Sequence, residues 1–278
     1  MLDLSVIIPS RECPYAMKTV QDVLDKATLN IEVLVAIDGP VPDKLVTDER
    51  VRYFYSNPAK GMRWGINQGI KHAKGKYLMK CDDHCLFDEG FDQKMIDEMQ
   101  PDWLMVPRRY SLDAENWKRR SYIRDYHYLH YPINSSWGNS MAVMEWRKRN
   151  DKLIDDTMIF QGSCWMAERD YFLKHIGSLD EKNYGKFGGE QMEIGLKYWL
   201  GGGAIKVNKK TWYAHLHKNK HYYYMNRKYN KGYKKSDDST KGRTWATHHW
   251  MNNEEPGMIH DFKWLIDKFN PPGWEGKI

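Results

Sequence analysis

Leu4-Ser5-Val6-Ile7-Ile8-Pro9 begins the stretch of sequence that decides the fold. This apolar run ends at a proline, and its β-branched composition is typical of a buried strand in a parallel sheet. A helical pattern over 14–28 follows it, and the next apolar run, Ile31–Ile37, predicts a second strand. A strand, a helix and a further strand in this order indicate a βαβ unit, in which the two strands are parallel.

The alternation continues downstream, and we predict an α/β fold with a mostly parallel central sheet flanked by helices. After it we expect an irregular region and a C-terminal helical extension. The remaining elements are predicted as a strand over Val51–Tyr55, a helix over 62–74 that ends at Gly75, a strand over Tyr77–Cys81, a helix over 86–102, an irregular stretch over 103–150, and helices over 168–175, 190–200 and 262–269.

Length and composition restrict the class of protein. The 278 residues, 41% of them hydrophobic and 29% charged, suit one large globular domain and exclude a disordered or collagen-like chain. No apolar run reaches the roughly 18–20 residues that span a bilayer, and the first residues lack the basic region of a signal peptide. The four cysteines have no disulfide-framework spacing. We therefore expect a cytoplasmic protein without a transmembrane segment.

The positive charge is concentrated late in the chain. The formal net charge is +6, yet residues 204–250 alone hold twelve Lys/Arg against two Asp. Within this region Tyr222–Lys235 interleaves aromatic and cationic residues. Such a segment fits a solvated loop, a lid that closes over a ligand, or a surface for a phosphate-bearing partner such as nucleic acid.

Two clusters of polar residues suggest chemistry. Asp82-Asp83-His84 follows the strand Tyr77–Cys81, and an Asp and a His two residues apart can turn toward one divalent ion such as Mn²⁺. The same residues also fit a solvated acidic turn. Glu190 and Glu193 lie in the first turn of a predicted helix, where acids favour the helix dipole, while Glu190 in a cleft could bind sugar hydroxyls.

The order of motifs resembles the nucleotide-sugar glycosyltransferases of the GT-A fold, which are family-2-like enzymes. The similarity is narrowest to the catalytic domain of polypeptide N-acetylgalactosaminyltransferases and covers roughly residues 4–217. It is carried by Ile7-Ile8-Pro9-Ser10-Arg11-Glu12, an Asp that closes the second strand, Gly75-Lys76-Tyr77-Leu78 before Asp82-Asp83-His84-Cys85, Gly162-Ser163-Cys164-Trp165-Met166-Ala167, Gly188-Gly189-Glu190-Gln191-Met192-Glu193-Ile194, and a later histidine.

The resemblance implies a metal-dependent transfer of a sugar from a UDP-sugar to a hydroxyl group. The enzymes of this family use an Asp-x-His metal motif in place of Asp-x-Asp. The metal, Mn²⁺ or Mg²⁺, would be held by Asp82, His84 and His215. Glu190 would hold the donor sugar, and Glu190 and Asp82 are the implied catalytic residues. The remaining implied donor-binding residues are Pro9, Arg11 and Asp38 at the uridine, Arg63 at the nucleotide, Asp83 near the ribose, Trp165 under the sugar or acceptor, and Lys218 at the diphosphate.

The implied domain spans 1–217, with a nucleotide-binding half over 1–102 and a donor-sugar and acceptor half over 103–217. Residues 218–278 would pack on it as a basic lid or acceptor segment with a C-terminal helix. The Gly-Gly-Glu-Gln pattern favours retention of anomeric configuration, with a protein Ser/Thr or a glycan as acceptor. Two alternatives stay open: transfer to hydroxymethylated DNA bases, as in phage DNA modification, and a non-catalytic module that binds carbohydrate or nucleic acid.

Overall fold

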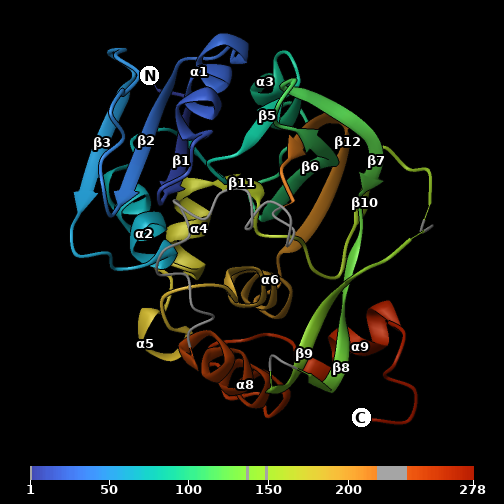
Figure 1. Cartoon of the computed structure of the whole chain (residues 1–278). Helices are drawn as coiled ribbons and strands as arrows, with labels where there is room; N and C mark the ends of the chain where they lie inside the picture. The colour runs from blue at the N-terminus through green and yellow to red at the C-terminus, as the bar shows by residue number, and fades with distance from the viewer. Residues whose placement is uncertain (1, 136–137, 148–149, 218–236) are drawn as a thin grey trace.

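The computed structural model describes residues 2–135, 138–147, 150–217 and 237–278 (Figure 1). Its centre is a ten-stranded sheet in which the central strands follow the order β12-β6-β11-β4-β1-β2-β3. Along this path β11 runs antiparallel to both neighbours, and the other pairings are parallel. The predicted α/β fold with a mostly parallel central sheet flanked by helices is therefore confirmed.

The N-terminal half consists of βαβ units. Alternate residues of the buried first strand face opposite layers, because Ile7 packs with Ile66 of one helix and Val6 packs with Val20 of another. The two helices thus cover opposite faces of the sheet. The elements of this half are β1 (Leu4–Ser10), α1 (Ala16–Lys26), β2 (Ile31–Asp38), β3 (Val51–Ser56), α2 (Met62–His72) and β4 (Tyr77–Cys81).

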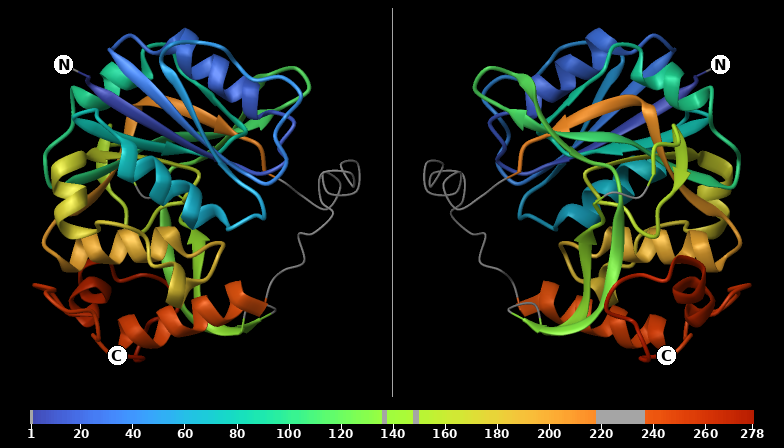
Figure 2. Two further views of the ribbon diagram at one scale, coloured as in Figure 1. Left: turned by 90° about the vertical axis from the view of Figure 1, so that its left-hand side faces the viewer. Right: turned by 90° about the vertical axis from the view of Figure 1, so that its right-hand side faces the viewer.

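The second half completes the sheet and adds an antiparallel ribbon, β8 with β9, that reaches toward the C-terminal helices (Figure 2). Its elements are β5 (Cys85–Phe87), α3 (Phe91–Ile96), β6 (Trp103–Asp113), β7 (Lys118–Arg124), β8 (His127–Ser135), β9 (Gly138–Glu145), β10 (Ile154–Asp156), β11 (Cys164–Glu168), α4 (Arg169–His175), α5 (Glu181–Tyr184), α6 (Glu190–Leu200), β12 (Ala204–His215), α8 (Asp237–Met251) and α9 (Phe262–Phe269).

Three local predictions were wrong. The stretch 86–102 holds the strand β5 and the short helix α3 in place of one helix, and the stretch 103–150, expected to be irregular, contains β6 to β9. Strands β5 and β6 pair with strands that are distant in the sequence, while β7 pairs with β6 and β8 with β9. Local periodicity does not report these pairings. Gly75 does not end α2, since Ala73 follows the helix in an extended conformation. A Cβ on Gly75 would lie 2.6 Å from the carbonyl carbon of Leu4, so tight packing against β1 requires the glycine.

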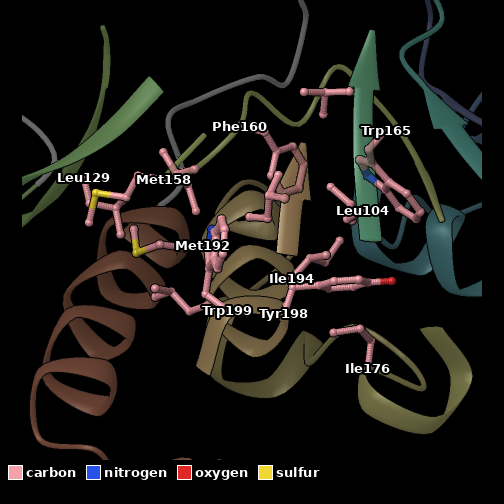
Figure 3. Close-up of a cluster of buried hydrophobic side chains, with 14 of the residues drawn as sticks. Leu104, Leu129, Met158, Phe160, Trp165, Ile176, Met192, Ile194, Tyr198 and Trp199 are labelled. Atoms are coloured by element: carbon pink, nitrogen blue, oxygen red, sulfur yellow. The ribbon is translucent and has the colours of Figure 1, made fainter. Parts of the chain in front are cut away.

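A large apolar core lies between the sheet and α6, and Figure 3 shows part of it. Ile194, Tyr198 and Trp199 of α6 are buried there with residues of β6 and β11. The C-terminal helices continue this core: Trp250 of α8 donates from Nε1 to the Tyr184 hydroxyl at 2.7 Å. Among the described helices, none combines the length and the apolar character that crossing a membrane requires.

Candidate functional site

Polar residues gather where β1, β2 and β4 end, because these strands are parallel and their carboxyl ends share one edge of the sheet. Asp82 to His84 follow β4 directly. His215 ends β12, which pairs antiparallel with β5, so that His215 stands opposite Cys85. The backbone N–H of Leu216 also donates to the carbonyl of His84 at 3.1 Å. Sheet pairing therefore brings together two histidines that are far apart in the sequence.

Asp82, His84 and His215 form a group whose ligand atoms all lie within 4.8 Å of one another. Nε2 of His215 lies 3.0 Å from Oδ2 of Asp82, and Nε2 of His84 lies 3.8 Å from the same oxygen. One carboxylate oxygen and two imidazole nitrogens suit Mn²⁺ or another first-row divalent ion. The Nδ1 atom of His215 is buried and has no partner among the described residues. The residue set thus fits the implied metal.

The protonation states suit metal binding. Burial lowers the pKa of His215 to about 3, so the imidazole is neutral near pH 7 and can ligate a metal. Burial alone would raise the pKa of Asp82, but the ammonium group of Lys80, together with the hydrogen bond to His215 and the nearby His84, outweighs burial and holds that pKa well below its usual range. Asp82 is therefore ionised.

Asp83 contacts His84 at Nδ1, the ring nitrogen other than the one that is near Asp82. Its side chain is buried, and Oδ1 lies 2.6 Å from Nδ1 of His84. A carboxylate in this position orients a metal-binding histidine and fixes its tautomer. Asp83 also belongs, with Cys13 and His84, to a second buried group with ligand spacing. The ribose contact that we predicted for Asp83 stays a prediction, and the structure gives its carboxylate a histidine partner.

Lys80 is a residue of this site that the sequence analysis missed. It lies in β4 with 1% of its side chain exposed, and Nζ contacts Oδ1 of Asp82 at 2.6 Å, the carbonyl of Gly162 at 2.6 Å and Oε1 of Glu190 at 3.0 Å. Burial by itself would lower the pKa of Lys80, but the two carboxylates raise it well above its usual value. A lysine inside an otherwise apolar strand was the available signal, because such a residue is buried only with partners.

Glu190 begins α6 and reaches the same centre. Its N-cap is Gly189, whose φ of 72° is left-handed, and 2% of Glu190 is exposed. Burial raises the pKa of Glu190, and Lys80 opposes that shift. Oε2 is buried without a partner among the described residues, and so is Oε1 of the nearby Gln161. Oε2 of Glu190 is therefore a buried acceptor without a hydrogen-bond donor in the part of the chain that the structure describes.

The predicted uridine residues lie at the same sheet edge. Pro9 is in β1, and Arg11 follows this strand with its side chain exposed. Asp38 ends β2, where it is buried and accepts hydrogen bonds from the backbone N–H groups of Lys60 at 2.5 Å and Gly61 at 2.9 Å. Asp38 therefore holds the loop before α2, and its contact with uracil stays a prediction.

Arg63, which we predicted to contact the nucleotide, has a fully buried side chain. The guanidinium is fully buried in an ion pair with Glu193, donates to the carbonyl of Gly188 at 3.0 Å, and lies over the ring of Tyr184 at 4.4 Å. These contacts join α2 to the start of α6. Arg63 thus positions the start of α6, where Glu190 lies, and its contact with the nucleotide stays a prediction.

Trp165 belongs to the core in this structure. It has no exposed surface and stacks on Phe172 with ring centroids 5.1 Å apart. Figure 3 draws it in the same buried cluster as Leu104 and Tyr198. Full burial separates Trp165 from a ligand, so a contact with sugar or acceptor stays a prediction that this packing does not favour. Lys218, and the basic segment up to residue 236, lie outside the described residues.

Comparisons with known proteins agree with the resemblance in the sequence. A putative polypeptide N-acetylgalactosaminyltransferase 13 of Drosophila melanogaster is 24% identical over 209 residues, which are 68% of this chain and 36% of that protein. Polypeptide N-acetylgalactosaminyltransferase 14 of Homo sapiens is 21% identical over 217 residues, 74% of this chain and 39% of the relative. The chain therefore spans little more than a third of the length of these relatives.

Among solved structures, GalNAc-T7 with UDP, GalNAc and Mn²⁺ has a TM-score of 0.74 at 16% identity, and the match covers 99% of this chain and 58% of that one. S. aureus TarS 1–349 in complex with UDP-GlcNAc has a TM-score of 0.50 at 14% identity, covering 76% and 58%. Both likenesses show the fold. The model of the family "Glycosyl transferase family 2" matches residues 5–176, more than half of the sequence, and the chain belongs to glycosyl transferase family 2.

Proposed function

We propose that this chain transfers a sugar from a UDP-sugar to a hydroxyl group of a protein Ser/Thr or a glycan, in a reaction that depends on Mn²⁺ or Mg²⁺. The observation that carries the proposal is the convergence of Asp82, His84 and His215 from two strand ends, with Glu190 tied to Asp82 through Lys80. The fold neighbour solved with UDP, GalNAc and Mn²⁺ supports this choice of donor and metal.

Asp82, His84 and His215 would hold the metal next to the diphosphate of the donor. A divalent ion bound there supplies a Lewis acid that stabilises the charge growing on the departing UDP. Glu190 would accept hydrogen bonds from the sugar through Oε2, the oxygen without a protein partner. Because Lys80 binds the other oxygen, Glu190 is held in one orientation before the sugar arrives.

Glu190 then orients the sugar and does not act as a general base for the acceptor. We therefore propose that the transfer retains the anomeric configuration of the sugar. The acceptor oxygen attacks the anomeric carbon on the face from which UDP leaves, and the bond from that carbon to the phosphate oxygen breaks with its electron pair on UDP. The acceptor proton passes to the departing phosphate oxygen, so the step needs no further base. Residues 1–102 form the proposed nucleotide-binding half, and residues 103–217 the half for sugar and acceptor.

The location proposed for the protein is the cytoplasm. All four cysteines are buried thiols outside any disulfide, which suits a reducing compartment.

The test is a screen of UDP-sugars with protein and glycan acceptors, read out by mass spectrometry of the products, with and without Mn²⁺. Asp82→Asn and His215→Ala should abolish transfer. His217→Ala is the matched control, because His217 is exposed two residues from His215 and outside the metal group, and it should keep wild-type activity. Full activity in a chelator would contradict the metal assignment, and product without any UDP-sugar dependence would contradict the donor.

A further inference from the structure

Lys80 occupies the centre of the site. A lysine ammonium group has three N–H donors, and the three acceptors around Nζ are Asp82 Oδ1, the Gly162 carbonyl and Glu190 Oε1, at 2.6, 2.6 and 3.0 Å. The strand pairing places Lys80 opposite the fully buried Trp165. The ammonium group therefore has a complete set of partners, and the side chain is almost fully buried.

Lys80 binds one oxygen of each of two carboxylates, those of Asp82 and Glu190, and leaves the second oxygen of each unbound by the ammonium group. Asp82 uses Oδ1 for Lys80, while Oδ2 faces His215 at 3.0 Å and His84 at 3.8 Å. Glu190 uses Oε1 for Lys80, and its Oε2 has no partner among the described residues. One oxygen is thus left for the metal and one for the sugar.

The negative charges of Asp82 and Glu190 explain why a cation is needed between the two carboxylates. Asp82 and Glu190 would carry two negative charges in a buried space, and carboxylates in that situation repel each other or bind a common cation. Lys80 is the cation that the chain supplies between them. Without it, the carboxylate of Glu190 would be free to turn toward a divalent ion bound at Asp82.

We propose that Lys80 is a positioning residue that restricts Asp82 to metal binding through Oδ2 and keeps Glu190 out of the metal's ligand set, so that Glu190 Oε2 faces the donor sugar. The proposal rests on the proposed function, since it assigns the two carboxylates to the metal and the sugar of that reaction. A lysine that merely fills the core would have no effect on which group binds the ion.

A positioning role and a purely structural role of Lys80 predict opposite changes in Mn²⁺ affinity when the lysine is replaced. In Lys80→Met, which keeps the side-chain length and removes the charge, Mn²⁺ should bind about tenfold more tightly, because a nearby positive charge is lost and Glu190 becomes available as a ligand. Sugar transfer should at the same time fall about 100-fold in kcat, since Glu190 no longer meets the sugar. A purely structural lysine predicts weaker Mn²⁺ binding together with lower activity.

The experiment is a titration of the purified full chain with Mn²⁺, followed by electron paramagnetic resonance, alongside UDP-sugar turnover. Lys80→Gln is measured in parallel, because it removes the charge but keeps a hydrogen-bond donor if Lys80→Met folds poorly. Lys80→Met/Glu190→Gln should return Mn²⁺ affinity to within about threefold of the wild type, since the released carboxylate is gone. Lys76→Met, the same change at an exposed position, should alter neither quantity.

Unchanged or weaker Mn²⁺ binding in both Lys80→Met and Lys80→Gln overturns the role of Lys80. Tighter binding that persists in the double variant overturns the part of the proposal that concerns Glu190. A wild type that binds no Mn²⁺ contradicts the metal site itself and with it the role of Lys80. A wild type that binds Mn²⁺ but transfers no sugar from any UDP-sugar contradicts the proposed function, while the metal titration of the variants still decides the role of Lys80.

Discussion

Gly162 and Glu190 lie so close together that a Cβ on Gly162 would stand 2.7 Å from the carboxylate carbon Cδ of Glu190. Outside their own residue and its chain neighbours, real Cβ atoms essentially never come within 3.0 Å of a heavy atom, so a larger residue at this position displaces one of the two groups. Glu190 has little freedom to move, because Oε1 is held by Lys80. The backbone at Gly162 is therefore part of the wall that sets the position of Glu190.

Gly162→Ala should reduce sugar transfer about 100-fold in kcat, because a displacement of Glu190 by about 1 Å is enough to lose its alignment with the sugar. The measurement is turnover of a UDP-sugar, with UDP affinity as a second value that should stay within about threefold. Gly195→Ala is the matched control: its Cβ would meet the end of the Ile159 side chain in the core, so it should affect stability and spare kcat per folded molecule. Equal kcat in wild type and Gly162→Ala would contradict the prediction.

Asp83→Asn should weaken Mn²⁺ binding about 10- to 100-fold, the usual effect of removing a carboxylate that orients a metal-binding histidine. The contact of Asp83 Oδ1 with His84 Nδ1 at 2.6 Å is the reason. Calorimetric or resonance titration with Mn²⁺ measures it, and Asp170→Asn, at a side chain that is 82% exposed, is the control. If Asp83 instead contacts the ribose, UDP affinity will fall while Mn²⁺ affinity does not change.

Arg63→Met should lower the free energy of unfolding by about 3–5 kcal/mol, because it leaves Glu193 buried without its cation. Urea unfolding measures this loss. Arg52→Met is the comparison, since Arg52 pairs with Glu32 at a position where 36% of the arginine side chain is exposed, and about 1 kcal/mol is expected. Glu193→Gln separates the two roles of Arg63: if Arg63 also contacts the nucleotide, UDP affinity will fall in Arg63→Met and not in Glu193→Gln.

His127 should make the protein less stable as the pH falls. Burial, with the charges of Arg109 and Arg124, lowers the pKa of His127 to about 3, whereas the unfolded chain has a pKa near 6.5. Between these values the unfolded state binds the extra proton, so stability decreases with falling pH by up to about 1.4 kcal/mol per pH unit, and above 6.5 this contribution does not vary.

His127→Phe keeps a ring and removes the titrating group. The difference in unfolding free energy between wild type and this variant should therefore depend on pH between about 6.5 and 3 and be constant above that range. Urea unfolding at a series of pH values checks it. Two profiles that stay parallel throughout would show that His127 does not titrate in this way.

Much of the N-terminal half could be predicted from the sequence, because its strands are continuous apolar runs and its helices have an apolar face. Strand β4 was predicted at its observed bounds, Tyr77–Cys81, and so was the last helix, Phe262–Phe269. The region 103–150 could not be predicted in this way. Strand β6 pairs with the distant strands β11 and β12, and β7 pairs with β6. The ribbon of β8 with β9 is polar and aromatic, and no local pattern indicates these pairings.

The sequence by itself determined the chemistry of the candidate site. Asp82 and His84 stand two residues apart after a buried strand, and Glu190 begins a helix after two glycines, so the types and order of these groups could be read directly. Only the tertiary structure decided which groups share a partner. Lys80 meets Asp82 and Glu190 because the β4–β11 pairing and the start of α6 bring together residues 110 positions apart, and Arg63 and Trp165 become buried for the same reason. Burial and long-range pairing are properties of the assembled sheet, and they set the position and charge of each group that the sequence had named.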